Sequence, residues 1–567
     1  MPASPLLPSR AVLWIIALAI VALSFANLGS HSLFHPDEGR YGEIAREMAQ
    51  SGDWVTPRLN GLKYFEKPPF QYWVTAAAFR AFGVHEWTTR LWPAVAGLLS
   101  VVAIGAAGMA LGGPPLGAFA AMALAGTLYH TAIAQIVTLD AGLGFFLTLA
   151  FAGLVIAQRA EAGAAERRAW MWTAWAAMAC AVLSKGLIGI VLPGGALVIY
   201  TAITRDVALW RRLHVVSGLA IFLAIAAPWF VLVSQANPEF ARFFFIHEHF
   251  ERFLTQEHQR VGPWYYFIPL ALVGVLPWLL PLAAGLPRAW RDGAPNALGF
   301  SWQRGALVWA GFAFVFFSAS GSKLPTYILP IFAPLALVAG ALLLELPASL
   351  LARFAAIGAI VAAAFAITLL AGYDSWVGTR GGSAEADQPA AILLAFGPWI
   401  KAAMTVVAAG QVIAWTQFRR VGRIPAARFL GVAALAVSMQ AAVTLTVAGY
   451  EAFSATRSTS AMLRAAGTAE TLFPDAPFYQ VEMYDQTVPF YLGRTTTLVA
   501  IRDELGLGID AEPAKQIPTT GAWIAQWDAV ARGYAMMPPA TFQRLAAAGV
   551  PMRELARDSR RVLVSRR

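Results

Sequence analysis

The sequence predicts an α-helical polytopic membrane protein with about thirteen transmembrane helices and a small soluble α/β domain at its C-terminal end. Of the 567 residues, 58% are hydrophobic and only 13% are charged, whereas soluble domains carry about 25% charged residues. Apolar stretches of spanning length also recur until about residue 449 and then stop. These observations exclude a nuclear factor, a cytosolic Rossmann enzyme and a disordered scaffold.

The apolar stretches are each long enough, at roughly 17–23 residues, to cross the hydrocarbon core of a bilayer. They lie near 11–29, 91–111, 115–135, 140–158, 169–184, 186–203, 214–235, 265–285, 304–320, 325–345, 351–371, 397–417 and 428–449. We expect the first to be an uncleaved anchor, because no A-x-A cleavage site ends it. The single cysteine, Cys180, excludes an intramolecular disulfide and a C-x-x-C zinc site.

Arginines in alternate loops predict the orientation of these spans. Those loops contain Arg159, Arg167, Arg168, Arg205, Arg211, Arg212, Arg288, Arg291, Arg304, Arg353, Arg419, Arg420, Arg423 and Arg428. By the positive-inside rule this side is cytoplasmic, together with the N-terminus. The net charge of +10 therefore indicates membrane topology rather than nucleic-acid binding. The long segments 30–90 and 236–264 and the C-terminal tail are expected on the opposite, periplasmic side.

The last part of the chain has a different pattern. After residue 449 the apolar runs shorten, and turn signals separate strand-like pieces such as 478–481 and 497–501. We therefore expect a transmembrane catalytic domain over 1–449 and a soluble α/β domain over 450–567. No motif assigns a role to the second domain.

The segment 30–90 contains the most informative motif, His35-Pro36-Asp37-Glu38-Gly39-Arg40-Tyr41. Two adjacent carboxylates beside an arginine are more than a connector needs, although Asp37 could also serve as a loop cap. Two amphipathic helices, at 38–50 and 69–83, are expected to lie in the membrane interface.

A second acidic candidate, Asp140, opens the fourth predicted span on the same side as this segment. A carboxylate at a membrane edge is costly unless it is paired or hydrated, which favours a functional role. The alternative is that Asp140 caps the N-terminus of its helix. Lys185 and Lys323 lie on this side as well, against the positive-inside trend.

The order of these motifs resembles the GT-C membrane glycosyltransferases of the protein O-mannosyltransferase-like superfamily. The runs 35–41, Lys67-Pro68-Pro69 and Ser322-Lys323-Leu324-Pro325-Thr326-Tyr327 are similar to those of the bacterial lipid A aminoarabinose transferases. The resemblance covers about the first 350 residues by motif, and the remainder by architecture only.

The resemblance implies transfer of 4-amino-4-deoxy-L-arabinose from undecaprenyl phosphate to a phosphate of lipid A, which masks negative charge and protects against polymyxin and cationic peptides. It makes Asp37, Glu38 and Asp140 the catalytic candidates, with the sugar near Asp37 and Asp140. Both lipids are anionic, so cations and hydroxyls are expected to bind phosphate or sugar. These candidates are Lys67, Arg40, Tyr64, Lys185, Arg252, Lys323 and Tyr327. The lysines could instead be snorkelling surface cations, and the tyrosines part of an aromatic belt.

A divalent metal, zinc or magnesium, is a further expectation. His247 and His249 lie in a segment rich in histidine and glutamate, and Glu66 precedes Lys67. Such side chains are common ligands of zinc and related ions. A solvated amphipathic helix with ion pairs is the alternative for this segment. No nucleotide or redox cofactor is expected.

Other functions stay open at this point. The same fold could transfer a hexuronic acid, or mannose to a protein, although a carboxylate-lined site favours a cationic or neutral sugar. A secondary transporter would be expected to show repeated halves and ionisable residues at mid-membrane, and neither is visible. We expect a monomer in the bacterial inner membrane, with its active site facing the periplasm and no nucleic-acid partner.

Overall fold

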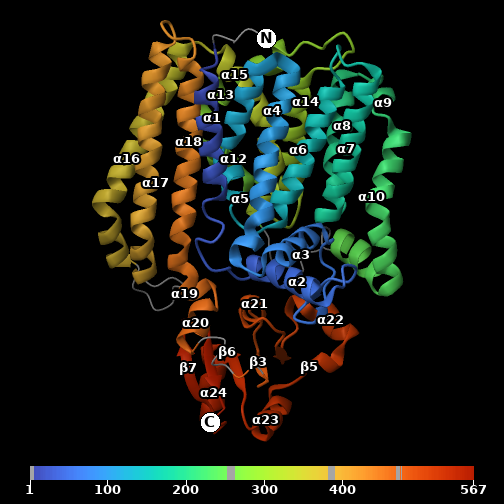
Figure 1. The fold of residues 1–567 in the computed structure, drawn as a ribbon, viewed down its shortest axis with the longest axis vertical. Coiled ribbons are helices and arrows are strands. Elements are labelled where there is room, and N and C mark those ends of the chain that lie inside the picture. The colour runs from blue at the N-terminus through green and yellow to red at the C-terminus, as the bar shows by residue number, and fades with distance from the viewer. Residues whose placement is uncertain (1–5, 252–261, 381–389, 468–472, 474, 567) are drawn as a thin grey trace. The chain divides into compact units, whose positions relative to one another are not determined.

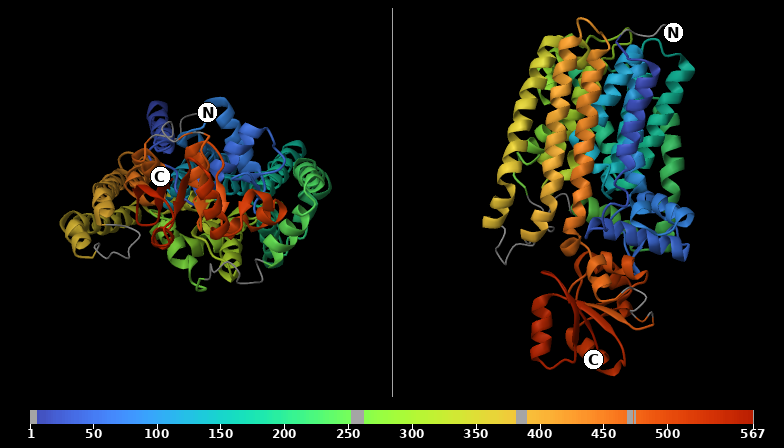
Figure 2. Two further views of the ribbon diagram at one scale, coloured as in Figure 1. Left: turned by 90° about the horizontal axis from the view of Figure 1, so that it is seen from below. Right: turned by 60° about the vertical axis from the view of Figure 1, so that its left-hand side comes forward.

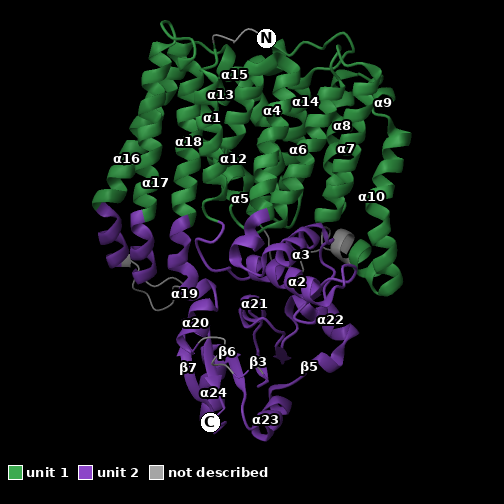
Figure 3. Cartoon of the chain, in the orientation of Figure 1, with its two compact units in different colours: residues 1–27, 92–371, 399–447 green, residues 28–91, 372–398, 448–567 purple. Residues whose placement is uncertain are grey.

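The computed structural model describes residues 6–251, 262–380, 390–467, 473 and 475–566, with the side chains of 247–251 and 380 outside the description. The chain divides into two compact units (Figure 3). We call the first the membrane unit; it comprises Met1–Asn27, Trp92–Ala371 and Trp399–Val447. We call the second the composite unit, because it joins Leu28–Leu91, Gly372–Pro398 and Ala448–Arg567.

The membrane unit is built from apolar helices, several of which lie side by side (Figure 1), as α6, α7, α8 and α14 do. Its helices, some of which extend into the other unit, are α1 (Arg10–Phe25), α4 (Glu86–Ala125), α5 (Leu128–Ile133), α6 (Leu139–Ala157), α7 (Ala164–Lys185), α8 (Ile188–Thr204), α9 (Leu209–Arg212), α10 (Val215–Ala236), η1 (Arg242–Glu251), α12 (Phe267–Gly274), α13 (Leu279–Asp292), α14 (Trp302–Ala319), η2 (Pro325–Ile331), α15 (Phe332–Glu345), α16 (Ala348–Arg380), α17 (Ala390–Arg420) and α18 (Ala427–Ala448). Figure 2 shows α16, α17 and α18 from two further directions.

The predicted count of thirteen spans is not confirmed. Each predicted stretch falls on helix. Within the described residues, however, seven helices are long and apolar enough to cross a membrane, or eight if one bent pair counts as a single span. The helices α1 and α8 are apolar but shorter.

The two stretches predicted at 91–111 and 115–135 meet in a tight reversal inside α4. Gly112 and Gly113 have non-helical backbone angles, and Gly113 has a φ of 73°, which glycine adopts without steric penalty. The two arms then approach closely. A Cβ added to Gly108 would lie 2.8 Å from the carbonyl oxygen of Leu116. Glycine is therefore required both at the turn and between the arms.

The single span predicted at 265–285 is wrong in detail. The structure has two helices there, α12 and α13, bent by 102°. Pro277 lies in the break, where it has no N–H to donate and its ring obstructs a continuous helix.

The N-terminal part of the composite unit contains two packed helices and a small hairpin. The helices α2 (Asp37–Ser51) and α3 (Phe70–Phe82) confirm the helices predicted at 38–50 and 69–83. Between them, β1 (Arg58–Leu59) and β2 (Leu62–Lys63) pair through Asn60-Gly61, both with positive φ. This dipeptide is favoured in a two-residue hairpin turn.

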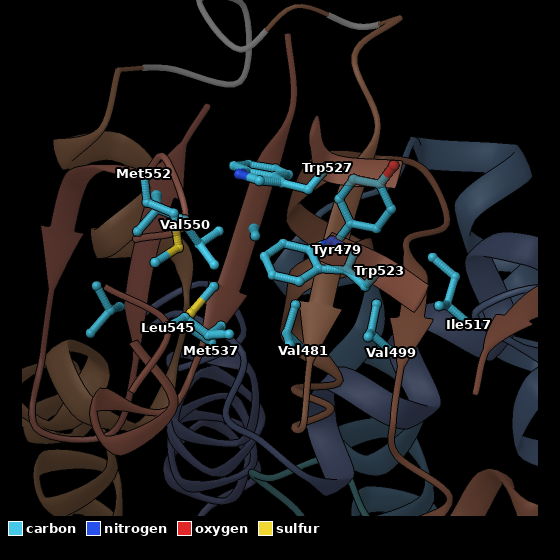
Figure 4. Close-up of a cluster of buried hydrophobic side chains, with 13 residues drawn as sticks. Tyr479, Val481, Val499, Ile517, Trp523, Trp527, Met537, Leu545, Val550 and Met552 are labelled. Carbon is cyan, nitrogen blue, oxygen red and sulfur yellow. The ribbon is translucent and has the colours of Figure 1, made fainter. Parts of the chain in front are cut away.

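The C-terminal part of the composite unit is an α/β domain, as predicted. Its six-stranded sheet has the order β5-β4-β3-β6-β8-β7, in which the first four strands are parallel and the last two pairings are antiparallel. The core packs Trp523 and Trp527 against Tyr479 (Figure 4). The strands are β3 (Phe478–Val481), β4 (Thr497–Val499), β5 (Gln516–Ile517), β6 (Tyr534–Met537), β7 (Arg553–Arg557) and β8 (Val562–Ser565). The helices are η3 (Gly449–Phe453), α19 (Ser454–Arg457), α20 (Ser460–Ala465), α21 (Thr487–Leu492), η4 (Asp503–Leu505), α22 (Gly506–Ala511), η5 (Pro513–Lys515), α23 (Thr520–Ala529) and α24 (Pro539–Ala547).

The units differ from the predicted domains, because the segments 28–91 and 372–398 of the predicted domain 1–449 belong to the composite unit. The predicted boundary at 449/450 is close to the observed change of unit between Val447 and Ala448. The segment 28–91, expected in the catalytic transmembrane domain, instead forms one compact unit with 448–567.

Candidate active site

Asp37 and Glu38 open helix α2, and the structure gives them different environments. Successive helical residues point about 100° apart, so adjacent carboxylates face different neighbours. The Asp37 side chain is 47% exposed, whereas the Glu38 side chain is 7% exposed. Asp37 is therefore the more accessible carboxylate of the pair.

Glu38, predicted as a catalytic residue, is held in a buried ion pair with Arg90. The Arg90 Nε and Nη2 donate to the two Glu38 oxygens at 3.0 and 2.8 Å. Burial opposes ionisation, but Arg90 and His31 hold the pKa of Glu38 well below its usual range. The backbone N–H of Phe34 also donates to Glu38. Both carboxylate oxygens are thus engaged in holding the loop, and a catalytic role of Glu38 stays a prediction from the sequence.

Arg90 anchors the segment that leads to Asp37. Its side chain is fully buried at the start of α4. Besides the two bonds to Glu38, it donates to the carbonyl oxygens of Leu28, His31 and Ser32 at 3.1, 2.7 and 3.2 Å. A guanidinium has five N–H donors, and all five are used here.

Arg40, predicted to bind substrate phosphate, is already paired with carboxylates. Its Nη1 donates to Asp37 Oδ1 at 2.8 Å, and its Nη2 forms an ion pair with Glu504. Gln486 donates to the other Glu504 oxygen at 2.7 Å. The Arg40 side chain is 9% exposed. Arg40 therefore orients Asp37, and its role as a phosphate ligand stays a prediction from the sequence.

Tyr64, Glu66 and Lys67 lie between β2 and α3. Tyr64 is buried, and burial raises the pKa of its hydroxyl, which stays a hydrogen-bond donor at neutral pH. The Lys67 ammonium donates to the Glu66 carbonyl oxygen at 2.6 Å. Pro68 and Pro69 follow directly and restrict the backbone before α3.

In the membrane unit, the structure joins three predicted residues: Asp140, Lys185 and Tyr327. Asp140 lies in the first turn of α6, whose N-cap is Thr138, so the alternative that Asp140 is the cap is wrong. Its carboxylate forms an ion pair with Lys185 at the C-terminal end of α7. The Lys185 ammonium also lies 4.5 Å from the centroid of the Tyr327 ring, within cation–π range.

Lys323 lies in the segment between α14 and η2. Its side chain is buried, and its ammonium donates to the Ser320 carbonyl oxygen at 2.6 Å. Within the part of the chain that the structure describes, Lys323 makes no ion pair with a carboxylate. The binding of Lys323 to a substrate phosphate stays a prediction from the sequence.

Three predicted residues lie outside the description. Arg252 belongs to an undescribed segment, and the side chains of His247 and His249 are not described. Among the described residues, no group of three His, Cys, Asp or Glu side chains is arranged to hold a metal. The divalent metal on Glu66, His247 and His249 thus stays a prediction from the sequence.

Sequence reasoning missed the long-range partners of the Asp37 segment. These are Arg90, Glu504 and a buried pair, Asp485 and Arg561. Each is far from residue 37 along the chain. The one available signal was Arg90, a charged residue directly before a predicted span.

Comparison with known proteins relates this geometry to a family. Residues 465–566 match the aminoarabinose transferase C-terminal domain, and residues 11–244 match the dolichyl-phosphate-mannose-protein mannosyltransferase family. An undecaprenyl phosphate-alpha-4-amino-4-deoxy-L-arabinose arabinosyl transferase of Pseudomonas fluorescens is 32% identical over 344 residues, 59% of this chain and 60% of the relative. One from Edwardsiella ictaluri is 31% identical, over 57% of this chain and 58% of the relative. The chain thus spans about three-fifths of the curated relatives it matches.

A solved structure is similar over the full length. ArnT from Cupriavidus metallidurans bound to undecaprenyl phosphate is 37% identical, with a TM-score of 0.90 and 98% of both chains covered. Its apo state gives a TM-score of 0.88 with the same identity and coverage. On this match the chain is a bacterial membrane protein of the predicted GT-C fold class, and it belongs to the ArnT family of aminoarabinose transferases.

Proposed function

We propose that the chain transfers 4-amino-4-deoxy-L-arabinose from undecaprenyl phosphate to a phosphate of lipid A, as a monomer in the bacterial inner membrane. The observation that carries the proposal is the match over 98% of both chains to a protein bound to undecaprenyl phosphate. The names of the curated relatives support the same donor and sugar. The resulting loss of negative charge on lipid A would weaken binding of polymyxin and other cationic peptides.

The reaction exchanges one glycosyl phosphate for another. The bond between the sugar C1 and the donor phosphate oxygen breaks, and the undecaprenyl phosphate leaves with the electron pair. A lipid A phosphate oxygen forms the new bond to C1. Because phosphate is already ionised near neutral pH, the acceptor needs no general base.

Asp37 is proposed to stabilise positive charge on the sugar. Its carboxylate is half exposed and is oriented by Arg40. A carboxylate there would favour the oxocarbenium-like charge that develops at C1, or the ammonium group of the sugar. Tyr64, as a buried hydroxyl donor, is proposed to contribute a hydrogen bond to donor or sugar.

The phosphates are proposed to bind to lysine side chains. Lys323 carries a buried ammonium group that donates to the Ser320 carbonyl oxygen, and Lys67 lies on a backbone restricted by two prolines. Lys185 is paired with Asp140, so its role is to fix Asp140. The arginine-rich loops support an orientation with the N-terminus cytoplasmic and Asp37 periplasmic.

Mass spectrometry of lipid A tests the proposal. A polymyxin-sensitive host that makes the donor but lacks its own transferase is complemented with the wild-type chain or with Asp37→Asn. We expect an aminopentose mass increment with the wild type and its loss in the variant. An increment that survives Asp37→Asn would contradict the role of Asp37. Its absence with well-expressed wild-type chain would contradict the proposed reaction.

A further inference from the structure

The C-terminal domain contacts the segment that carries Asp37 on both sides of that residue. On the N-terminal side, the His35 backbone N–H donates to the Arg457 carbonyl oxygen at 2.9 Å. The Arg560 guanidinium also contacts the His35 Nε2. A buried, neutral imidazole nitrogen accepts such a bond, and burial together with the nearby arginines lowers the pKa of His35 to about 4.

On the C-terminal side, Gly39 lies directly against the chain at residues 486–487. A Cβ added to Gly39 would lie 2.7 Å from Thr487 Cγ2 and 2.9 Å from the Gln486 carbonyl carbon and the Thr487 backbone nitrogen. Backbone atoms cannot move aside as the end of a flexible side chain can. The first turn of α2 is therefore packed against a fixed piece of the C-terminal domain.

A buried ion pair fixes that piece. Arg561 donates to Asp485 Oδ2 at 2.7 Å, and the two side chains are 0% and 1% exposed. Asp485 Oδ1 accepts from both the backbone N–H and the hydroxyl of Thr487, at 2.9 and 2.6 Å. Arg561 also donates to the Ser458 carbonyl oxygen at 2.9 Å. The Asp485–Arg561 pair thus fixes both Thr487, which lies against Gly39, and Ser458, which follows Arg457 in the chain.

We propose that Asp485 and Arg561 are positioning residues of the C-terminal domain, which hold the His35–Arg40 segment so that Asp37 keeps its working geometry. This inference rests on the proposed function for its catalytic consequence. It assigns a role to a domain that carries no catalytic motif. Misplacement of a catalytic group by about 1 Å can lower a rate roughly a hundredfold. Loss of the contacts that hold the His35–Arg40 segment should therefore lower the transfer rate measurably.

The test uses two variants of the full chain in detergent with matched controls. Asp485→Asn removes the charge of the buried pair, and its control is Glu482→Gln, which breaks an ion pair with Arg544 in the same domain. Gly39→Ala forces α2 away from Thr487, although alanine is the better helix former. Its control is Gly521→Ala in α23, where an added Cβ meets nothing within 4 Å.

Two measurements are made on each variant: hydrogen exchange of the backbone amides of residues 34–41, and kcat and KM with the undecaprenyl-linked sugar. We expect exchange to accelerate about tenfold or more in Asp485→Asn and Gly39→Ala. We expect kcat to fall by about tenfold or more, with KM within about twofold. Both controls should match the wild type. The conservative change Arg560→Lys, which keeps a donor for His35, should retain most of the activity.

Each outcome decides a separate point. Unchanged exchange in Gly39→Ala would overturn the positioning role even if Asp485→Asn fails to fold. Faster exchange with unchanged kcat would also overturn it, since the hold on the segment would then not serve catalysis. A wild-type chain without transfer activity would contradict the proposed function, while the exchange data would still decide whether the C-terminal domain holds the segment.

Discussion

Replacing Arg90 by methionine should loosen the Asp37 segment far more than an ordinary surface substitution. The change leaves the Glu38 carboxylate buried without its counter-charge, which destabilises by about 3–5 kcal/mol. The carbonyl groups of Leu28, His31 and Ser32 also lose a donor. Since 1.36 kcal/mol is a factor of ten, about 4 kcal/mol corresponds to roughly a thousandfold faster hydrogen exchange in residues 28–38 through local unfolding.

The double variant Arg90→Met with Glu38→Gln separates the ion pair from simple loss of packing. Removing both charges eliminates the unpaired carboxylate, so the double variant should be more stable than Arg90→Met alone, with a coupling energy of about 2 kcal/mol. Arg80→Met is the control, because Arg80 is exposed, donates to the Ala49 carbonyl oxygen and lies over the Trp54 ring, without a buried carboxylate partner among the described residues. Additive effects of the two single changes would refute the reasoning from a buried pair.

Two further predictions concern His35 and Asp140. Burial and neighbouring arginines lower the pKa of His35 to about 4, whereas an unfolded histidine titrates near 6.5. As the pH falls, the unfolded state therefore binds the proton first. The free energy of unfolding falls by about 2.5 kcal/mol between pH 7 and pH 4.5. Melting curves should show a smaller acid sensitivity in His35→Gln, and parallel pH profiles would contradict this. Asp140→Asn leaves Lys185 without its partner and should destabilise by about 3 kcal/mol. Adding Lys185→Met should restore much of the melting temperature, and equal melting temperatures for Asp140→Asn and the double variant would argue against a paired role.

Local patterns in the sequence predicted most of the architecture. Apolar length located the helices, and the observed turn at Gly112-Gly113 falls in the gap between the predicted stretches 91–111 and 115–135. The shift to short strands located the α/β domain. The break in 265–285 was overlooked because hydropathy does not register Pro277, although the proline itself was a sufficient signal.

The candidate site was predicted less completely, for a physical reason. Sequence reasoning named both Asp37 and Glu38 as catalytic candidates, yet the turn of the helix exposes Asp37 and buries Glu38. Which face is buried depends on Arg90, and the partner of Arg40 is Glu504. Such pairs join residues far apart in the chain, and no spacing rule along the sequence reports them.

The composite unit also has a consequence for the order in which the protein is made. His35 leaves the ribosome more than five hundred residues before Arg560 and Arg561, the partners on which its segment depends. At about 5–20 residues per second, the delay is roughly half a minute to two minutes. Throughout that interval the Asp37 segment lacks its contacts with Arg560 and with the chain that Arg561 fixes. Under the positioning role proposed for Asp485 and Arg561, the Asp37 segment would reach its working geometry only after Arg561 has been made.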